Sequence, residues 1–244
     1  MRRGDLATPA VIWHDAENGA YSGDLALWEE LAAAAGGPIL DLGCGTGRVA
    51  LHLARRGHPT VGLDLDPELI AALEHRAEGL SLRGVVGDAR SFELDEVLAL
   101  VLAPMQLAQL LPDSAERTES LRCIASHLRP GGRVALSIVE GLPEAAEGPP
   151  PLPDVREVDG WVYSSLPLDA VDIGPEIVIQ RLRQTVSPDG ELSEEENEIR
   201  IRTLGAEELE DEGLAAGLKP LPRRRIAPTD LHVGSTVVVL EKGG

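Results

Sequence analysis

Short apolar runs alternate with amphipathic stretches from residue 38 onward. The apolar runs have the length and composition of buried strands, and they cover residues 39–42, 60–64, 84–86, 97–103 and 133–139. Between them, apolar residues recur at helical spacing over 48–56, 66–77 and 113–128. Strands that alternate with helices at this pace form right-handed βαβ units. The pattern therefore predicts an α/β fold with a doubly wound, mostly parallel sheet.

The pattern changes after residue 140. Strand-like runs follow at 157–165, 176–186 and 192–203, and a Pro-Asp-Gly turn at 188–190 joins the last two into a hairpin. A helix at 206–216 and strands at 219–226 and 233–241 complete the pattern, so the main sheet is predicted to have seven strands. We expect four segments: an N-terminal lid or helical segment (1–37), a ligand-binding Rossmann-like core (38–140), an antiparallel β insertion after the fifth strand that covers the substrate (141–204), and a C-terminal helix with the last two strands of the core sheet (205–244).

Charge and composition narrow the range of partners. The chain has 41 acidic and 22 basic residues, a net charge of -19, and residues 140–213 hold 20 of the acids and only 5 of the bases. A chain this acidic repels a phosphate backbone, so we expect no nucleic-acid partner. Its longest apolar run, at 97–105, is too short to cross a bilayer, so we expect no membrane partner. Two cysteines, Cys44 and Cys123, give neither a disulfide framework nor a four-thiolate metal site. Together with an N-terminus that lacks a secretory signal, they favour the cytoplasm.

A glycine-rich turn follows the first strand of the core. Asp41, Gly43, Gly45 and Gly47 occupy alternate positions and lead into the helix at 48–56. Glycine lets a ligand approach the backbone closely, and the start of a helix presents free N–H groups. The spacing differs from the G-x-G-x-x-G of dinucleotide enzymes. The carboxylate of Asp41 would repel a pyrophosphate but would suit an ammonium group or another cationic centre.

Two further acids follow the next two strands. Asp64 ends the second strand, where an acid in a Rossmann-like sheet accepts hydrogen bonds from a ribose diol. Asp88 follows the third strand, where a carboxylate can accept a hydrogen bond from the exocyclic amine of a purine. Acids for an ammonium group, a ribose and an adenine, without a phosphate-binding residue, indicate S-adenosylmethionine as the ligand.

With these motifs, and with the turn Leu-Arg-Pro-Gly-Gly at 128–132, residues 37–140 resemble the class I S-adenosylmethionine-dependent methyltransferases of small-molecule type. The resemblance implies in-line transfer of a methyl group to N or O of a small molecule, with S-adenosylhomocysteine as product. It implies a cofactor site made by Tyr21, Asp41, Gly43, Cys44, Gly45, Thr46, Gly47, Arg48, Asp64, Leu65, Gly87, Asp88, Ala89 and Ala103.

The same resemblance places the methyl acceptor over the carboxyl ends of the fourth and fifth strands. The candidates for this pocket are Trp13, Met105, Gln106, Gln109, Glu140, Trp161, Tyr163 and Arg181. The rings outside the core could instead anchor the extra segments, which is the reading we favour for Trp28. For Arg181 and Arg183, a ladder of ion pairs with the facing glutamates 194–196 and 198 is favoured over substrate binding.

Catalysis of in-line methyl transfer does not require an acid or base. His14 and His232 could nevertheless take a proton from the acceptor, because histidine titrates near neutral pH. Two other functions stay open: a non-catalytic module that binds S-adenosylmethionine or S-adenosylhomocysteine, and an aminopropyl transferase. The second needs an acidic cluster after the fourth strand, and residues 103–111 contain none. The sequence leaves a monomer and a homodimer equally open.

Overall fold

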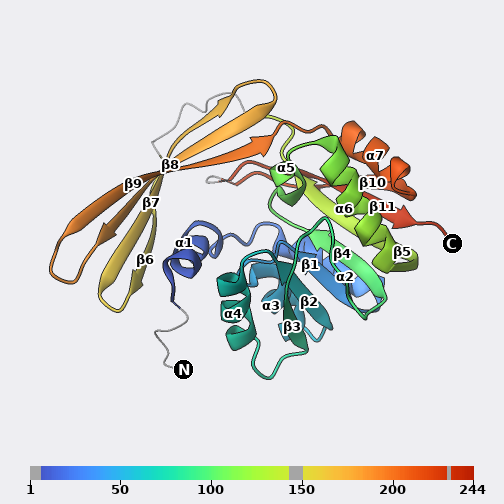
Figure 1. The fold of residues 1–244 in the computed structure, drawn as a ribbon, viewed down its shortest axis with the longest axis horizontal. Coiled ribbons are helices and arrows are strands. Elements are labelled where there is room, and N and C mark those ends of the chain that lie inside the picture. The colour runs from blue at the N-terminus through green and yellow to red at the C-terminus, as the bar shows by residue number, and fades with distance from the viewer. Residues whose placement is uncertain (1–6, 143–150, 230–231) are drawn as a thin grey trace.

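The computed structural model describes residues 7–142, 151–229 and 232–244. Residues 1–6 of the expected lid and residues 143–150 of the expected insertion lie outside this part of the chain. The described residues form a seven-stranded sheet with helices on both faces and a separate four-stranded sheet that projects from it (Figure 1).

The large sheet has the strand order β10-β11-β5-β4-β1-β2-β3. Its strands are β1 (Ile39–Leu42), β2 (Thr60–Asp64), β3 (Leu82–Val86), β4 (Leu98–Ala103), β5 (Leu128–Ile138), β10 (Leu218–Ile226) and β11 (Ser235–Lys242). In the described residues β11 runs antiparallel to both of its neighbours, and the other pairs are parallel. The predicted seven-stranded, mostly parallel sheet is confirmed.

The helices cover both faces of this sheet, as a doubly wound fold requires. They are α1 (Pro9–Asn18), α2 (Leu25–Ala35), α3 (Arg48–Arg55), α4 (Pro67–Arg76), α5 (Leu107–Leu110), α6 (Ser114–His127) and α7 (Ala206–Ala215). Leu40 and Leu42 of β1 point into the core under α6 and α7, whereas the alternate residue Ile39 points into the core under α2 and α3. None of the helices in the described ranges combines the length and apolar composition that a membrane span requires.

Local capping signals set where two of these helices begin. The Asp66 carboxylate accepts a hydrogen bond from the Glu68 N–H at 2.8 Å, and Pro67 occupies the first helical position of α4. At α6 the Asp113 carboxylate accepts from the Glu116 N–H at 2.9 Å. These caps also fix where the segments that precede α4 and α6 end.

The insertion forms an antiparallel sheet of β6 (Asp154–Val158), β7 (Trp161–Asp172), β8 (Glu176–Val186) and β9 (Leu192–Arg202). The hairpin predicted over 176–203 is confirmed, since Glu176 pairs with Arg202 and Val186 with Leu192. A single strand over 157–165 was wrong. Asp159 and Gly160 both have positive φ, 51° and 83°, and turn the chain between β6 and β7. Asp-Gly is the preferred sequence for such a tight hairpin turn.

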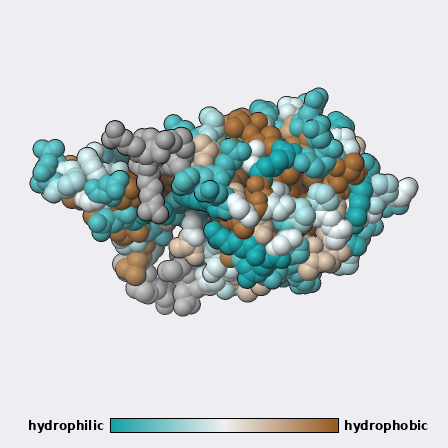
Figure 2. Space-filling model, turned by 90° about the horizontal axis from the view of Figure 1, so that it is seen from below, coloured by the Kyte–Doolittle hydropathy of each residue, from teal (hydrophilic) through white to brown (hydrophobic). Residues whose placement is uncertain are grey.

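The projecting sheet, which we call the arm (residues 154–202), joins the core at its base. Ile177, Val178 and Ile201 are buried there. Farther out, Val155 and Leu192 are 61% and 59% exposed, and the arm shows apolar residues among hydrophilic ones (Figure 2). Helix α1 lies between the arm and α4 (Figure 1), and it contacts β6, β7 and α4. Helix α1 is therefore the second connection between the arm and the core.

Candidate functional site

The glycine turn lies at the carboxyl edge of the sheet, between β1 and α3. Gly43, Gly45 and Gly47 all have positive φ, at 70°, 53° and 94°. A Cβ atom added to Gly45 would lie 2.1 Å from His14 Nε2, and one added to Gly47 would lie 2.2 Å from Leu73 Cδ1. The glycines are thus required by the backbone conformation and by side chains of the protein itself. The sequence had favoured the approach of a ligand as the reason for these glycines.

Asp64, at the end of β2, is tied to this turn. Its Oδ2 accepts a hydrogen bond from the Gly45 N–H at 2.8 Å, and its Oδ1 accepts from the Asp66 N–H at 3.0 Å. A carboxylate has about four lone-pair positions, so two remain for a ligand. Leu65 and Val86, at the ends of β2 and β3, are large apolar side chains that are 69% and 53% exposed. An oriented carboxylate therefore lies among apolar side chains that nothing in the described chain covers.

Asp41 is buried beneath the turn. Its Oδ2 accepts a hydrogen bond from the Ala50 N–H at 2.8 Å, while no described residue donates to its buried Oδ1. Burial raises the pKa of Asp41 to about 7, and the positive charge of Arg48 and the Ala50 hydrogen bond only partly offset this. Asp41 therefore fixes the first turn of α3, and one of its oxygens is free for an N–H donor or a proton.

Arg48, expected to contact the cofactor, is held by the protein. Its guanidinium donates to both Asp24 oxygens at 2.5 Å and 2.7 Å, and to the Tyr21 carbonyl oxygen at 3.0 Å. Asp24 also accepts a hydrogen bond from Trp28 Nε1 at 2.8 Å, and Trp28 is fully buried. The anchoring role predicted for Trp28 is confirmed. Arg48 fastens the segment before β1 to the glycine turn, and it lies 5.2 Å from the Tyr21 ring centroid.

Tyr21 and His232 form a pair of rings at the β5 side of the site. Their centroids are 4.5 Å apart, with an interplanar angle of 34°. His232 lies between β10 and β11, close to Thr236, which pairs with Ile138 at the carboxyl end of β5. The structure thus brings one candidate histidine to the edge where the methyl acceptor was expected.

The other candidate histidine, His14 of α1, lies at the β2 side. Its imidazole is against Gly45, and Asp64 is one of the charges that act on it. Burial lowers the pKa of His14, opposed by the carboxylates of Asp15, Asp64 and Glu17. His14 therefore lies against the turn that follows β1, whereas His232 lies in the loop that leads to β11, the neighbour of β5.

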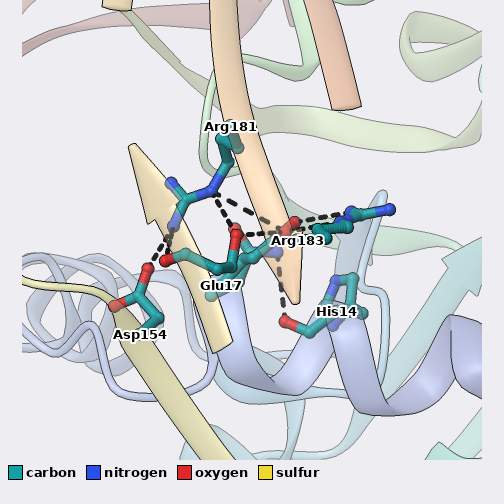
Figure 3. Close-up of polar contacts among 7 residues, drawn as sticks. His14, Glu17, Asp154, Arg181 and Arg183 are labelled. Carbon is teal, nitrogen blue, oxygen red and sulfur yellow. Dashed lines mark hydrogen bonds and ion pairs between the residues drawn. The ribbon is translucent and has the colours of Figure 1, made fainter. Parts of the chain in front are cut away.

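Four charged side chains join α1 to the arm (Figure 3). The Glu17 carboxylate accepts hydrogen bonds from Arg183 at 2.8 Å and 2.9 Å and from the Ser165 hydroxyl at 2.8 Å. Arg181 donates to the Ser165 hydroxyl at 2.7 Å and also binds Asp154. Burial alone would raise the pKa of Glu17, but these hydrogen bonds outweigh it and hold the pKa below its usual value.

This interface contains three residues that the sequence placed in the acceptor pocket. Trp13 and Tyr163 contact each other edge to face, with ring centroids 5.3 Å apart, and the Arg183 guanidinium lies 5.1 Å from the Trp13 centroid. Arg181, the third of them, is occupied by Ser165 and Asp154. The predicted ladder was wrong for both arginines: Arg183 lies opposite Glu195 in the β8–β9 register, but its hydrogen bonds go to α1.

Asp15 connects α1 to three other parts of the molecule, and the sequence gave no sign of it. It accepts hydrogen bonds from the Thr46 hydroxyl at 2.6 Å and from Arg76 of α4 at 2.9 Å and 2.6 Å, and it lies 3.1 Å from Arg156 of the arm. A local sequence pattern could not show this role, because the partners of Asp15 are residues 46, 76 and 156, which are distant in the sequence. Asp15 therefore links the glycine turn, α4 and the arm.

The candidates that follow β4 include two residues with strained backbone and one buried residue that has a structural role. Met105 and Gln106 have positive φ, 51° and 62°, a strained conformation that is common at functional sites. Gln109 is buried and exchanges hydrogen bonds with the backbone of Val139 at 2.7 Å and 3.1 Å. Its amide also donates to the carbonyl oxygen of residue 202 at 2.7 Å. Gln109 thus fastens α5 to β5 and the arm instead of lining an open pocket.

Glu140 and Trp161 also differ from expectation. The Glu140 carboxylate accepts hydrogen bonds from the Ala206 N–H at 3.1 Å and from the Thr236 hydroxyl at 2.5 Å. These bonds lower the pKa of Glu140 and stabilise the first turn of α7. Trp161 is 41% exposed and follows the β6–β7 turn. The hydrogen bonds of Glu140 and the exposed position of Trp161 do not indicate a role in binding the methyl acceptor.

The remaining cofactor candidates surround the ends of β1, β3 and β4. Arg90 donates to Asp88 through its backbone N–H and its side chain, both at 2.9 Å, and lowers the pKa of Asp88 to about 2. Gly87 N–H donates to the Asp64 carbonyl oxygen at 2.9 Å, so the loops after β2 and β3 are joined. Ala89 packs against the core, Ala103 and Cys44 are buried, and the thiol of Cys44 has a raised pKa because of that burial.

Comparison with known protein families finds a match for the strands that form this edge of the sheet. Residues 39–132 match the family model described as a methyltransferase domain. This match runs from β1 to the start of β5. The resemblance seen in the sequence is confirmed at the level of the fold, since solved methyltransferase structures share it.

Curated relatives match about half of the chain. A cypemycin N-terminal methyltransferase from Streptomyces sp is 32% identical over 105 residues, which are 43% of this chain and 43% of that protein. A ribosomal protein L11 methyltransferase from Cupriavidus metallidurans is 31% identical over 141 residues, which are 55% of this chain and 44% of that protein. The chain thus matches less than half the length of these relatives.

Solved structures match the fold over nearly the whole chain, including the arm. The sugar N-methyltransferase KedS8 from Streptoalloteichus sp ATCC 53650 has a TM-score of 0.74 at 19% identity, covering 96% of this chain and 92% of its own. The amino pentose methyltransferase CalS10 from Micromonospora echinaspora, solved with bound S-adenosylmethionine, has a TM-score of 0.69 at 22% identity, covering 93% and 96%. At these identities the likeness shows the fold.

Proposed function

We propose that this chain is an S-adenosylmethionine-dependent methyltransferase that transfers a methyl group to N or O of a small molecule. One observation carries the proposal: the Asp64 carboxylate is held by the N–H groups of Gly45 and Asp66 at the carboxyl edge of a methyltransferase domain. The likeness of the whole chain to sugar and amino pentose N-methyltransferases supports a small acceptor. Two free cysteines, Cys44 and Cys123, support action in the cytoplasm.

The residues at this edge fit the cofactor. The free lone pairs of Asp64 suit two ribose hydroxyls, and the exposed side chains of Leu65 and Val86 suit the faces of an adenine ring. The unpartnered Oδ1 of Asp41 lies below the turn, where an amine N–H or a proton would satisfy it. When bound, S-adenosylmethionine supplies a methyl group on a positively charged sulfur. A nitrogen or oxygen lone pair of the acceptor would attack this methyl carbon in line, so that the new bond would form as the methyl–sulfur bond breaks.

The contribution of the chain is alignment, exclusion of water and removal of a proton. Helix α1 covers the glycine turn on the β2 side, whereas Tyr21 and His232 lie on the β5 side. His232 is exposed and lies at the edge expected for the acceptor, so it is the histidine placed to receive the acceptor's proton. Met105 and Gln106, in their strained conformation after β4, form the neighbouring wall.

Labelled methyl transfer tests this function. The protein is incubated with methyl-labelled S-adenosylmethionine and a panel of small amines, amino sugars and phenols, and S-adenosylhomocysteine formation is measured. We expect turnover with at least one acceptor, and a 10- to 100-fold lower kcat for His232→Ala with unchanged affinity for S-adenosylhomocysteine. The matched control is His58→Ala, which lies on the opposite edge of the sheet before β2. No turnover with any acceptor, despite tight cofactor binding, would contradict the enzymatic proposal and favour a binding module.

A further inference from the structure

His14 approaches the glycine turn more closely than any side chain could approach a residue with a Cβ atom. The position of a Cβ on Gly45 would be 2.1 Å from His14 Nε2 and 2.3 Å from His14 Cε1. The N–H of the same Gly45 donates to Asp64 Oδ2 at 2.8 Å. The ring edge that carries Nε2 therefore lies against the residue whose N–H binds the carboxylate proposed to hold the ribose, and the charge of that carboxylate acts on the ring.

The hydrogen bonds around Thr46 determine which ring nitrogen of His14 carries the proton. The Thr46 hydroxyl has one proton, and its oxygen lies 2.6 Å from the Asp15 carboxylate, to which it donates. The same oxygen lies 3.4 Å from His14 Nδ1. Since the hydroxyl proton is already used, Thr46 can only accept in this second contact, and Nδ1 is the donor. In a neutral imidazole, Nε2 then presents a lone pair.

The surrounding charges are consistent with a neutral ring held in one orientation. Asp15 is ionised, because two hydrogen bonds from Arg76 and one from Thr46 outweigh the effect of burial and lower its pKa. The groups acting on His14 are the carboxylates of Asp15, Asp64 and Glu17 and the guanidinium of Arg76, and burial is the largest effect and lowers the pKa of His14. Asp15 and Thr46 thus fix the tautomer and the position of the ring.

The strand order indicates which part of the cofactor lies near His14. Gly45 follows β1 and Asp64 ends β2, while the methyl acceptor is expected over β4 and β5, on the other side of β1. A histidine beside Asp64 is therefore on the ribose side of the site. This position separates it from His232, which lies beside Tyr21 near the end of β5.

We propose that His14 is a cofactor-binding residue whose Nε2 accepts a hydrogen bond from a ribose hydroxyl of S-adenosylmethionine, next to Asp64. Asp15 and Thr46 act through His14 as positioning residues. The inference rests on the proposed function, and it assigns to α1 a direct contact with the cofactor. It also assigns the two candidate histidines different roles, because His14 holds the ribose and His232 receives the proton of the acceptor.

Calorimetric titration with ligands that differ in one hydroxyl tests this contact. The probes are S-adenosylhomocysteine and its 2′-deoxy and 3′-deoxy analogues, and the variants are His14→Leu and His14→Gln. Leucine removes the acceptor at similar volume, whereas glutamine keeps an oxygen that can accept. We expect His14→Leu to weaken S-adenosylhomocysteine at least tenfold, about 1.4 kcal/mol, and to weaken one deoxy analogue less than twofold. His14→Gln should bind within threefold of the unmodified protein.

Three results are decisive. Unchanged affinity of His14→Leu for S-adenosylhomocysteine, or an equal loss for all three ligands, would overturn the proposed hydrogen bond. A lower kcat and a lost limb of the pH–rate profile at unchanged affinity would assign His14 to proton transfer instead. Failure of the unmodified protein to bind S-adenosylhomocysteine would refute the proposed function itself. His14→Phe, which keeps a ring without nitrogen, gives the same comparison if the leucine variant does not fold.

Discussion

The Glu17 carboxylate accepts two hydrogen bonds from the Arg183 guanidinium across 166 positions of sequence. Glu17 comes from α1 and Arg183 from β8, so this pair joins the helix over the glycine turn to the arm. The Glu17 side chain is 8% exposed and the Arg183 side chain 18% exposed. Removing one member of a nearly buried ion pair leaves the other charge without compensation.

We therefore expect Arg183→Met to lower the free energy of unfolding by about 3 kcal/mol. The double variant Glu17→Gln, Arg183→Met should recover part of this loss, because no buried charge is then left alone. The control is Arg200→Met, because the Arg200 side chain is 52% exposed and its guanidinium pairs with Glu176 and Glu198. That change should cost less than about 1 kcal/mol. Urea denaturation of the four proteins measures the difference, and equal losses for both single arginine variants would contradict the account.

Gln109 links α5, the end of β5 and the last residue of β9 through three hydrogen bonds. The variant Gln109→Leu leaves the buried N–H and C=O of Val139 and one further carbonyl without partners. We expect a loss of about 3 kcal/mol in denaturant unfolding. Gln180→Leu is the control, because Gln180 is exposed and makes one long contact to Glu198 at 3.5 Å. It should change stability by less than about 0.5 kcal/mol; a similar small effect at Gln109 would argue against this clamp.

Comparing Gly47 with Gly190 separates two costs of replacing a glycine, namely backbone strain and steric conflict of the added Cβ atom. Gly47 and Gly190 both have positive φ, 94° and 87°, but a Cβ on Gly47 would lie 2.2 Å from Leu73 whereas nothing lies within 4 Å at Gly190. Gly190→Ala should cost only the conformational strain, about 1–2 kcal/mol. Gly47→Ala adds an overpacked contact, so we expect a total of about 3 kcal/mol or more. Thermal unfolding of both variants gives the comparison, and equal shifts would show that the turn relaxes around a methyl group.

The buried carboxyl of Asp41 makes stability depend on pH. Its pKa is raised to about 7 in the folded protein, so between about pH 4 and pH 7 the folded chain holds a proton that the unfolded chain has lost. This contribution is present at low pH and disappears as the pH rises through 7. Between pH 5 and pH 8 the unfolding free energy of the unmodified protein should therefore fall relative to that of Asp41→Asn by about 2 kcal/mol. A difference that stays constant over this range would exclude a protonated Asp41 near neutral pH.

The sequence correctly predicted those parts of the fold that are determined by residues close together in the sequence. The strands at 39–42 and 60–64 match β1 and β2 in both bounds, because short, mostly apolar runs that end at a glycine or an aspartate need no distant information. The caps at Asp66 and Asp113 are local in the same way. The Asp-Gly turn at 159–160 was equally local, and the strand predicted through it was an avoidable error.

The site was harder because its contacts are long-range. Arg183 pairs opposite Glu195 as the hairpin register implied, but the register does not tell which face of the arm meets α1. Nor does a local pattern show that Asp15 and Glu17 are buried, since most acidic residues are exposed. Aromatic residues outside the core were expected to cover a ligand. Trp13 and Tyr163 instead contact each other between α1 and the arm.

The central claim is that Asp64 holds the ribose of S-adenosylmethionine, and binding of S-adenosylhomocysteine measured by calorimetry tests it most directly. The comparison is between the unmodified protein, Asp64→Asn, and the neighbouring control Asp66→Asn, in which asparagine can still cap α4. We predict measurable binding to the unmodified protein, binding weakened at least tenfold in Asp64→Asn, and affinity within about twofold in Asp66→Asn. Equal affinity of Asp64→Asn and the unmodified protein, or no binding by either, would contradict the account.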